Sequence, residues 1–272
     1  MKTHIKARLE APDAYPPRSV GGEDGGPVPE DRVPWSTDLP GYDPPYFVAQ
    51  RVLDNDRTKT PGGWADPEDV GRVTRDIVSF EGSIRRDADG RPLNACGRTG
   101  IAGRGLLGKW GPNVAADPIL TRPGSGGGPL EMLAIRRRDN GLWAIPGGMV
   151  DDGEEIAATL KRELEEETGV RVDLNDAIEV HRGYVDDPRN TDHAWMESVV
   201  VVKHLDAAAA AALEARAGDD AVDVRWMPIT EQTLAAMHAS HGSIVRRAVE
   251  VLRGRGVVVM RSSDRVVSGK PC

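Results

Sequence analysis

The chain has 272 residues, which is enough for one large domain or two modest ones with a substantial hydrophobic core. Its 43 acidic and 35 basic residues give a net charge of −8, so nucleic acid and anionic membrane surfaces, which bind basic footprints, are not expected as partners. Two cysteines, Cys96 and Cys272, are too few for a disulfide framework. The sequence shows neither a secretory signal nor an apolar run of about 18 residues that could span a membrane. These features predict a soluble, acidic protein of a reducing, cytoplasmic compartment.

The first part of the chain is rich in proline, glycine and acidic residues. Residues 1–45 have too little apolar surface to offset chain entropy and predict an irregular arm that becomes ordered near Trp35. Residues 46–53 predict a strand, and the short apolar pieces that follow, separated by glycine and proline, predict a small β-rich domain. The expected division is an arm over 1–45, a β-rich domain over 46–118, a larger domain over 119–255 and a tail over 256–272.

The larger domain shows a change of pattern. Short apolar runs predict strands at 132–135, 143–145, 178–185, 194–202 and 222–227. Helical patterns occupy 154–168, 206–217 and 230–253, the last with a break near 241–242. Strands that alternate with helices in this way predict an α/β fold with mixed strand pairing.

The helix predicted over 154–168 carries an unusual set of carboxylates. At about 100° per residue, its apolar residues share one side, and three carboxylates lie on an arc that overlaps this side: Glu163, Glu166 and Glu167. A solvated acidic helix, the alternative interpretation, would place its carboxylates opposite the apolar side. Carboxylates crowded on a half-buried face raise each other's pKa unless a cation lies between them. Their hard oxygen atoms suit magnesium or manganese, and Arg162 can orient one of them.

The spacing around this helix identifies a known pattern. Gly148 is followed after five residues by Glu154, and after seven more by the run Arg162-Glu163-Leu164-x-Glu166-Glu167-x-Gly169-Val170. This is the complete Nudix box, and the sequence resembles the Nudix hydrolases. The resemblance implies an α/β/α sandwich around a mixed sheet, and attack of water on a phosphorus of a nucleoside diphosphate linked to another group. It also implies a divalent-metal site formed by the box residues Gly148, Glu154, Glu163, Glu166 and Glu167.

Segments outside the box bear on the substrate. Residues 94–118, 183–197 and 217–226 are similar to the group that includes the animal ADP-ribose pyrophosphatase and the ADP-ribose-recognising domain of melastatin-type cation channels, and the similarity covers most of residues 15–250. Taken alone, the first segment is equally typical of a glycine-rich turn, and 186–192 of a hairpin connection. The resemblance implies that a set of residues lines the substrate cleft: Asn113, Asp117, Met149, Asp187 and Arg189.

The expected function is the magnesium-dependent hydrolysis of ADP-ribose to AMP and ribose 5-phosphate, by a monomer or a simple homo-oligomer. Two alternatives remain open, a non-hydrolytic ADP-ribose sensor and a Nudix diphosphatase for another nucleotide sugar or a dinucleotide. The channel domains tend to depart from the Arg-Glu-Leu-x-Glu-Glu pattern, which this chain keeps. For the general base, the resemblance points to a loop downstream of the box, here Asp219 or Asp220, although these are equally typical of solvated turn residues. Glu163 is the competing candidate.

Overall fold

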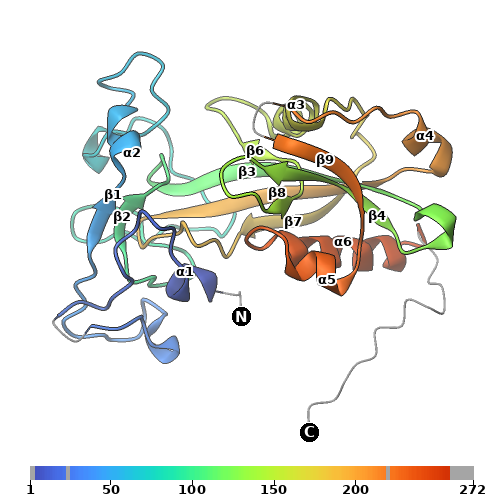
Figure 1. Ribbon diagram of the computed structural model, residues 1–272. Helices are drawn as coiled ribbons and strands as arrows, with labels where there is room; N and C mark the ends of the chain where they lie inside the picture. Colours follow the sequence, from blue (N-terminus) through green and yellow to red (C-terminus); the bar gives the residue numbers. More distant parts are fainter. Residues whose placement is uncertain (1–3, 23–24, 219–220, 258–272) are drawn as a thin grey trace, which may run out of the picture. The chain divides into compact units, whose positions relative to one another are not determined.

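A computed structural model describes residues 4–22, 25–218 and 221–257, which belong to two compact units (Figure 1). The first unit comprises residues 1–115 and 182–199, and the second comprises 116–181 and 200–272. This division differs from the one expected from composition, because residues 182–199 belong to the first unit although they lie between two segments of the second unit in the sequence. No helix in the described ranges is long and apolar enough to cross a membrane.

The first unit has little regular structure. Its elements are α1 (Lys6–Leu9), the short 3-10 helices Glu30–Arg32 and Val70–Arg72, β1 (Tyr46–Val48), α2 (Gln50–Asp54) and β2 (Ala102–Gly105), with β1 and β2 paired in parallel. The strand predicted over 46–53 is wrong in its second half, where α2 begins at Gln50. A helical turn places Ala49 and Val52 on one side, where both are buried against Ala65.

A seven-stranded sheet contains all the other strands of the described residues. Its strands are β3 (Gly111–Arg122), β4 (Glu131–Arg137), β5 (Trp143–Ala144), β6 (Gly148–Met149), β7 (Ile178–Tyr184), β8 (Ala194–His204) and β9 (Ala221–Pro228). The order is β5-β4-β3-β8-β7, with β6 beside β3 and β9 beside β4. β4 runs antiparallel to β3, β5 and β9. The full length of β3 was not anticipated, because Pro112 and Pro118 are typical of irregular segments rather than of strand interiors.

Helices cover both faces of the sheet within the second unit (Figure 1). They are α3 (Ile156–Thr168), α4 (Ala207–Ala211), α5 (Glu231–Ala235) and α6 (His241–Gly254). Leu120 and Leu133 belong to the hydrophobic cluster that includes α3, whereas their neighbours Ile119 and Met132 belong to the cluster that includes α5 and α6. Successive strand residues point to opposite faces. This alternation produces the expected α/β/α arrangement.

Two predicted helices differ in length from those observed. The helix expected over 206–217 ends at Ala211, because the chain beyond it forms backbone hydrogen bonds with the end of α3, from Arg216 N–H to the Thr168 carbonyl at 2.7 Å. The helix expected over 230–253 is two helices, and the break lies before residue 241, where Ala239 has a positive φ of 44°.

Candidate active site

The carboxylates of α3 lie against the glycine pair that precedes it. The Gly147 N–H donates to Glu167 Oε2 at 2.8 Å. At Gly148, a Cβ atom would lie 2.3 Å from Glu163 Oε1 and 2.5 Å from Oε2, so only glycine leaves room for this carboxylate. The β6–α3 segment therefore holds two box carboxylates beside the backbone of residues 147 and 148.

Asp117 of β3 lies at the same place. A Cβ on Gly147 would be 2.1 Å from Asp117 Oδ1, and the Asp117 side chain is buried. The charge of Asp117 is one of the causes that raise the pKa of Glu167. Packing of the sheet against α3 thus brings Asp117, which was expected in substrate binding, next to the box carboxylates.

Arg162 links the acidic residues on the exposed side of this group. Its Nε and Nη2 donate to the two oxygens of Glu154 at 2.9 and 2.8 Å, and Nη1 donates to Glu163 at 2.7 Å and to Glu166 at 3.0 Å. Nη2 also donates to the Met149 carbonyl at 3.2 Å. The hydrogen bonds from Arg162 are the main cause that lowers the pKa of Glu154 to about 2.

Burial divides the three helix carboxylates. The Glu166 side chain is 58% exposed, whereas that of Glu163 is 12% exposed and Glu167 is buried. Burial is the main cause that raises the pKa of both Glu163 and Glu167, the latter to about 7. The charge of Glu163 also raises the pKa of Glu167, and the charges of Glu166 and Glu154 raise that of Glu163. Carboxylates held together in a poorly solvated place repel each other, and a bound cation would relieve this repulsion.

The donor set fits a hard divalent cation, since it consists of carboxylate and carbonyl oxygens. In the arrangement described here Arg162 is inserted between the acidic residues, and no three His, Cys, Asp or Glu side chains of residues 4–22, 25–218 and 221–257 converge tightly enough to form a complete metal site. The residues positioned to hold a cation at residues 147–148 are Glu163 and Glu167, with Glu166 one helical turn from Glu163.

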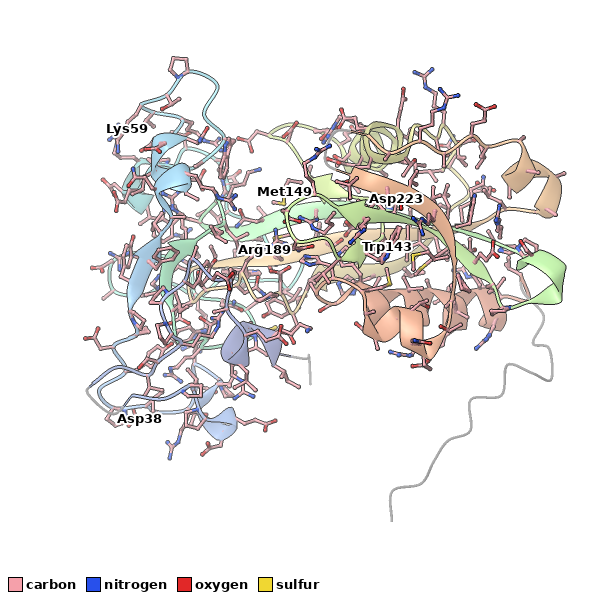
Figure 2. The ribbon with its side chains drawn as sticks, in the orientation of Figure 1. Asp38, Lys59, Trp143, Met149, Arg189 and Asp223 are labelled. Carbon is pink, nitrogen blue, oxygen red and sulfur yellow. The ribbon has the colours of Figure 1, made fainter. Side chains whose placement is uncertain are left out.

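Three residues expected in substrate binding belong to the first unit. Arg189 lies on the loop between β7 and β8 (Figure 2), and its Nε and Nη2 donate to the two oxygens of Asp187, each at 2.8 Å. Asp187 is buried, and the Arg189 side chain is 32% exposed. Asn113 is buried, and its side-chain amide bonds the backbone of Lys109 and Gly111. Asp187 therefore orients Arg189, and Asn113 stabilises a turn.

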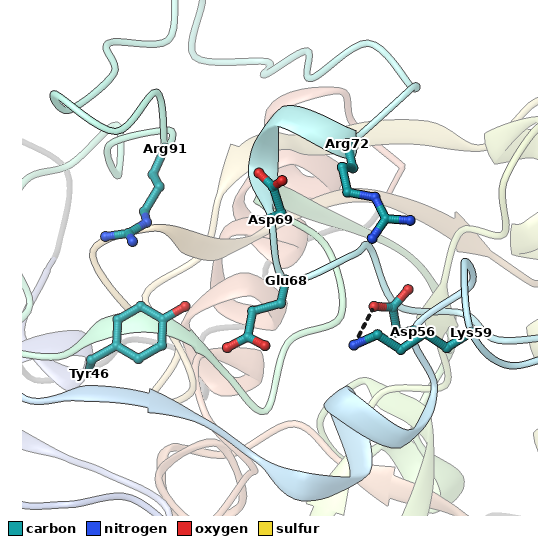
Figure 3. Close-up of a pocket in the computed structure, with 7 residues that line it drawn as sticks. All are labelled: Tyr46, Asp56, Lys59, Glu68, Asp69, Arg72 and Arg91. Carbon is teal, nitrogen blue, oxygen red and sulfur yellow. Dashed lines mark ion pairs between the residues drawn. The ribbon is translucent and has the colours of Figure 1, made fainter.

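A separate hollow of about 530 Å³ lies in the first unit (Figure 3). Its lining contains three carboxylates and three cationic side chains, and Asp56 pairs with Lys59 at 3.3 Å. The charges balance, and the carboxylates are interspersed with cations rather than grouped. This hollow is consequently not an arrangement that favours a metal or a polyanion.

The glycines beside the box complete the description of this site. Asp219 and Asp220 lie outside the described residues. Just before them, Gly218 N–H donates to the Glu167 carbonyl at 3.1 Å, and a Cβ there would lie 1.6 Å from the Glu166 carbonyl oxygen. The close approach at Gly218 agrees with the expectation that glycine there permits tight packing, whereas the role of Gly147 was not predicted, and the adjacent Pro146-Gly147-Gly148 sequence was its available signal.

Family models and known proteins match most of the chain. Residues 112–248 match the model of the NUDIX domain, and residues 28–111 match that of the NUDT9-like N-terminal domain. The chain is 38% identical over 287 aligned positions to the mitochondrial ADP-ribose pyrophosphatase of Rattus norvegicus, and the alignment covers 91% of this chain and 78% of that one. It is 37% identical to the transient receptor potential cation channel subfamily M member-like 2 of Nematostella vectensis, where the match covers 82% of this chain and 16% of the channel.

Proposed function

The chain is a hydrolase of the Nudix family, and from this premise we propose that it hydrolyses ADP-ribose to AMP and ribose 5-phosphate with magnesium as cofactor. The observation that carries the proposal is the group of carboxylates at Gly147 and Gly148, where Glu167 is buried and Glu163 is 12% exposed. The choice of ADP-ribose is supported by the rat relative, whose name gives that substrate and which aligns with 91% of this chain.

The box residues have distinct roles in this proposal. Glu163, Glu166 and Glu167 hold the metal, with Glu154 and the Gly148 carbonyl as supplementary ligands. Arg162 keeps Glu154 and Glu163 oriented through hydrogen bonds of 2.7 to 2.9 Å. When bound, a divalent cation neutralises charge on the diphosphate and polarises the attacking water. Family hydrolases generally use divalent metal ions; magnesium is the specific proposal.

Candidate residues for substrate recognition are proposed separately in each unit, beginning with the first unit. Arg189 presents a planar guanidinium, which suits a phosphate oxygen pair, and Asp187 fixes its orientation. In the same unit, Asn113 contributes by stabilising the turn at 109–111. In the second unit, Asp117 and Met149 are the proposed residues.

For the general base we propose Asp219 or Asp220. Geometry ranks ahead of pKa in choosing such a group. The support is the hydrogen bond from Gly218 N–H to the Glu167 carbonyl, which ties the residue before them to the end of the box helix. Glu163 remains the competing base, although its use would take a ligand from the metal.

A substrate panel tests the proposal. The purified protein is incubated with magnesium and ADP-ribose, nucleotide sugars or dinucleotides, and products are separated by chromatography. Glu166→Gln keeps the side-chain size and removes one ligand charge, so we expect kcat to fall by about 100-fold. Glu165→Gln on the same helix is the matched control, because Glu165 is 44% exposed and pairs with Arg171 instead.

The outcomes separate the alternatives. AMP and ribose 5-phosphate as products, with ADP-ribose used most efficiently, support the proposal. Binding of ADP-ribose without turnover would favour a sensor, and preference for another nucleotide would move the assignment within the family. Equal activity of Glu166→Gln and Glu165→Gln would refute the metal site.

A further inference from the structure

The β7–β8 loop that carries Arg189 is held by the beginning of the chain. The Asp186 carboxylate accepts hydrogen bonds from three successive backbone N–H groups, those of Ile5, Lys6 and Ala7, at 2.9, 3.1 and 2.9 Å. These are the N–H groups at the start of α1, which have no partner within the helix. His4, next to them, is buried and bonds the Tyr184 hydroxyl at 2.6 Å. The start of the chain is thus docked on the end of β7 and the residues after it.

The following residues bind the backbone of the same loop. The Tyr15 hydroxyl donates to the Arg189 carbonyl at 2.7 Å. Arg18 Nη2 donates to the carbonyls of Pro188 and Asn190 at 2.6 and 3.0 Å. Three consecutive carbonyl groups, those of residues 188 to 190, are therefore held by two side chains, and both of these side chains are 8% exposed. We call residues 4–18 the N-terminal clamp.

The clamp acts on the backbone, and Asp187 acts on the side chain. Asp187 accepts from Arg189 Nε and Nη2 at 2.8 Å, and also from its backbone N–H at 2.8 Å. Arg189 is consequently constrained at its N–H, its carbonyl and its guanidinium. A cationic group held in this way pays less conformational entropy when an anion binds than one on a free loop.

We propose that Tyr15 and Arg18 are positioning residues for Arg189, so that the N-terminal clamp sets the affinity for the diphosphate of the substrate. This inference rests on the proposed function, in which Arg189 contacts that diphosphate. It assigns a role to a segment that composition predicted to be an irregular arm. The clamp acts at the binding step and leaves the box carboxylates untouched.

Tyr15→Phe is the direct test, because it removes one hydroxyl and retains the ring. We expect KM for ADP-ribose to rise about fivefold, the size of one lost buried hydrogen bond, with kcat within about twofold of the native value. Tyr42→Phe is the matched control. The Tyr15 hydroxyl also accepts from Leu106 N–H at 2.8 Å. The Tyr42 hydroxyl likewise has two hydrogen bonds, since it donates to Asp192 at 2.6 Å and accepts from Gly100 N–H at 3.1 Å, but its partners do not include the carbonyls of residues 188–190.

A double-mutant cycle separates positioning from general destabilisation. If Tyr15 acts through Arg189, Tyr15→Phe raises KM in the native background and has no further effect in Arg189→Ala. An equal rise of KM in both backgrounds, or an equal rise in Tyr42→Phe, overturns the inference. A fall in kcat without a change in KM overturns it as well.

The cycle also distinguishes this inference from the proposed function. If Arg189→Ala raises KM and Tyr15→Phe does not, the positioning role is wrong while the substrate assignment of Arg189 stands. If the protein hydrolyses ADP-ribose and Arg189→Ala leaves KM unchanged, the assignment of Arg189 is wrong, and the clamp has no role in affinity. Isothermal titration with a non-hydrolysable methylene analogue of ADP-ribose gives the same comparison without turnover.

Discussion

Gly148→Ala is expected to lower kcat strongly while it changes the free energy of unfolding little. The added Cβ would lie 2.3 Å from Glu163 Oε1, so the carboxylate must withdraw by about 1 Å to restore an ordinary contact. Misplacement of a reacting group by about 1 Å can cost about 100-fold in rate, and we expect a loss of kcat of that order. Gly148 does not have a positive φ, and the obstructing atoms are the end of a flexible side chain. The free energy of unfolding should therefore change by less than about 1 kcal/mol.

The assay combines steady-state kinetics on ADP-ribose with denaturant unfolding. Gly254→Ala is the control, since among the described residues no atom other than the neighbouring backbone of α6 lies within 4 Å of a Cβ at that position. We expect the control to keep native kcat and to gain a few tenths of a kcal/mol of stability from the better helix former. If Gly148→Ala has the kcat of Gly254→Ala, the contact between residue 148 and Glu163 is not part of catalysis. A loss of several kcal/mol of stability would instead assign Gly148 to folding.

Three further predictions concern other parts of the molecule. Burial lowers the pKa of His4 from 6.5 to about 4, so between these pH values the proton binds to His4 in the unfolded chain but not in the folded one. The free energy of unfolding should therefore fall by about 3 kcal/mol as the pH drops from 6.5 to 4, and comparison of the native protein with His4→Gln in unfolding experiments across this range measures the loss. If the difference in unfolding free energy between the two proteins is the same at pH 6.5 and pH 4, the burial argument is refuted. Gly218→Ala should lower kcat by about tenfold or more, because the added Cβ would lie 1.6 Å from the Glu166 carbonyl oxygen and would force the backbone away from α3. A native kcat in this variant would show that the contact is dispensable. Asp219→Asn or Asp220→Asn should reduce kcat much more than the affinity for the methylene analogue measured by calorimetry. If both variants and the double variant keep the native kcat, Glu163 becomes the candidate for the general base.

Local patterns predicted the parts of the fold whose causes are local. Helix α3 was predicted within two residues of its observed start, because its residues are good helix formers with apolar side chains at helical spacing. The length of β3 depends instead on pairing with β4 and other strands, which overrides Pro112 and Pro118. The shortness of α4 likewise depends on distant partners, since residues 216 and 218 bond the end of α3.

In the candidate site, too, the sequence predicted the local relations between residues but not those that depend on tertiary packing. The spacing of Glu163 and Glu167 predicted that they share a helix face, and both lie beside the glycine pair as a group. The nearness of Asp117 to Glu167 arises from packing of β3 against α3 and has no signal in sequence spacing. Composition also concealed the N-terminal clamp, because its hydrogen bonds join single side chains to backbone groups that are more than 150 residues away along the chain.

The interrupted path of the chain through the first unit has a consequence for synthesis. Residues 1–115 contain buried or half-buried groups that have partners in 182–199. The start of α1 bonds Asp186, Arg18 bonds the carbonyls of residues 188 and 190, and Ser79 bonds Glu197. At roughly 5–20 residues per second, a ribosome delivers these partners on the order of ten seconds after residue 115. During that interval the nascent N-terminal part carries unpaired polar groups, so the first unit completes its folding late, and truncated chains that end before residue 182 are expected to be substrates for chaperones and proteases.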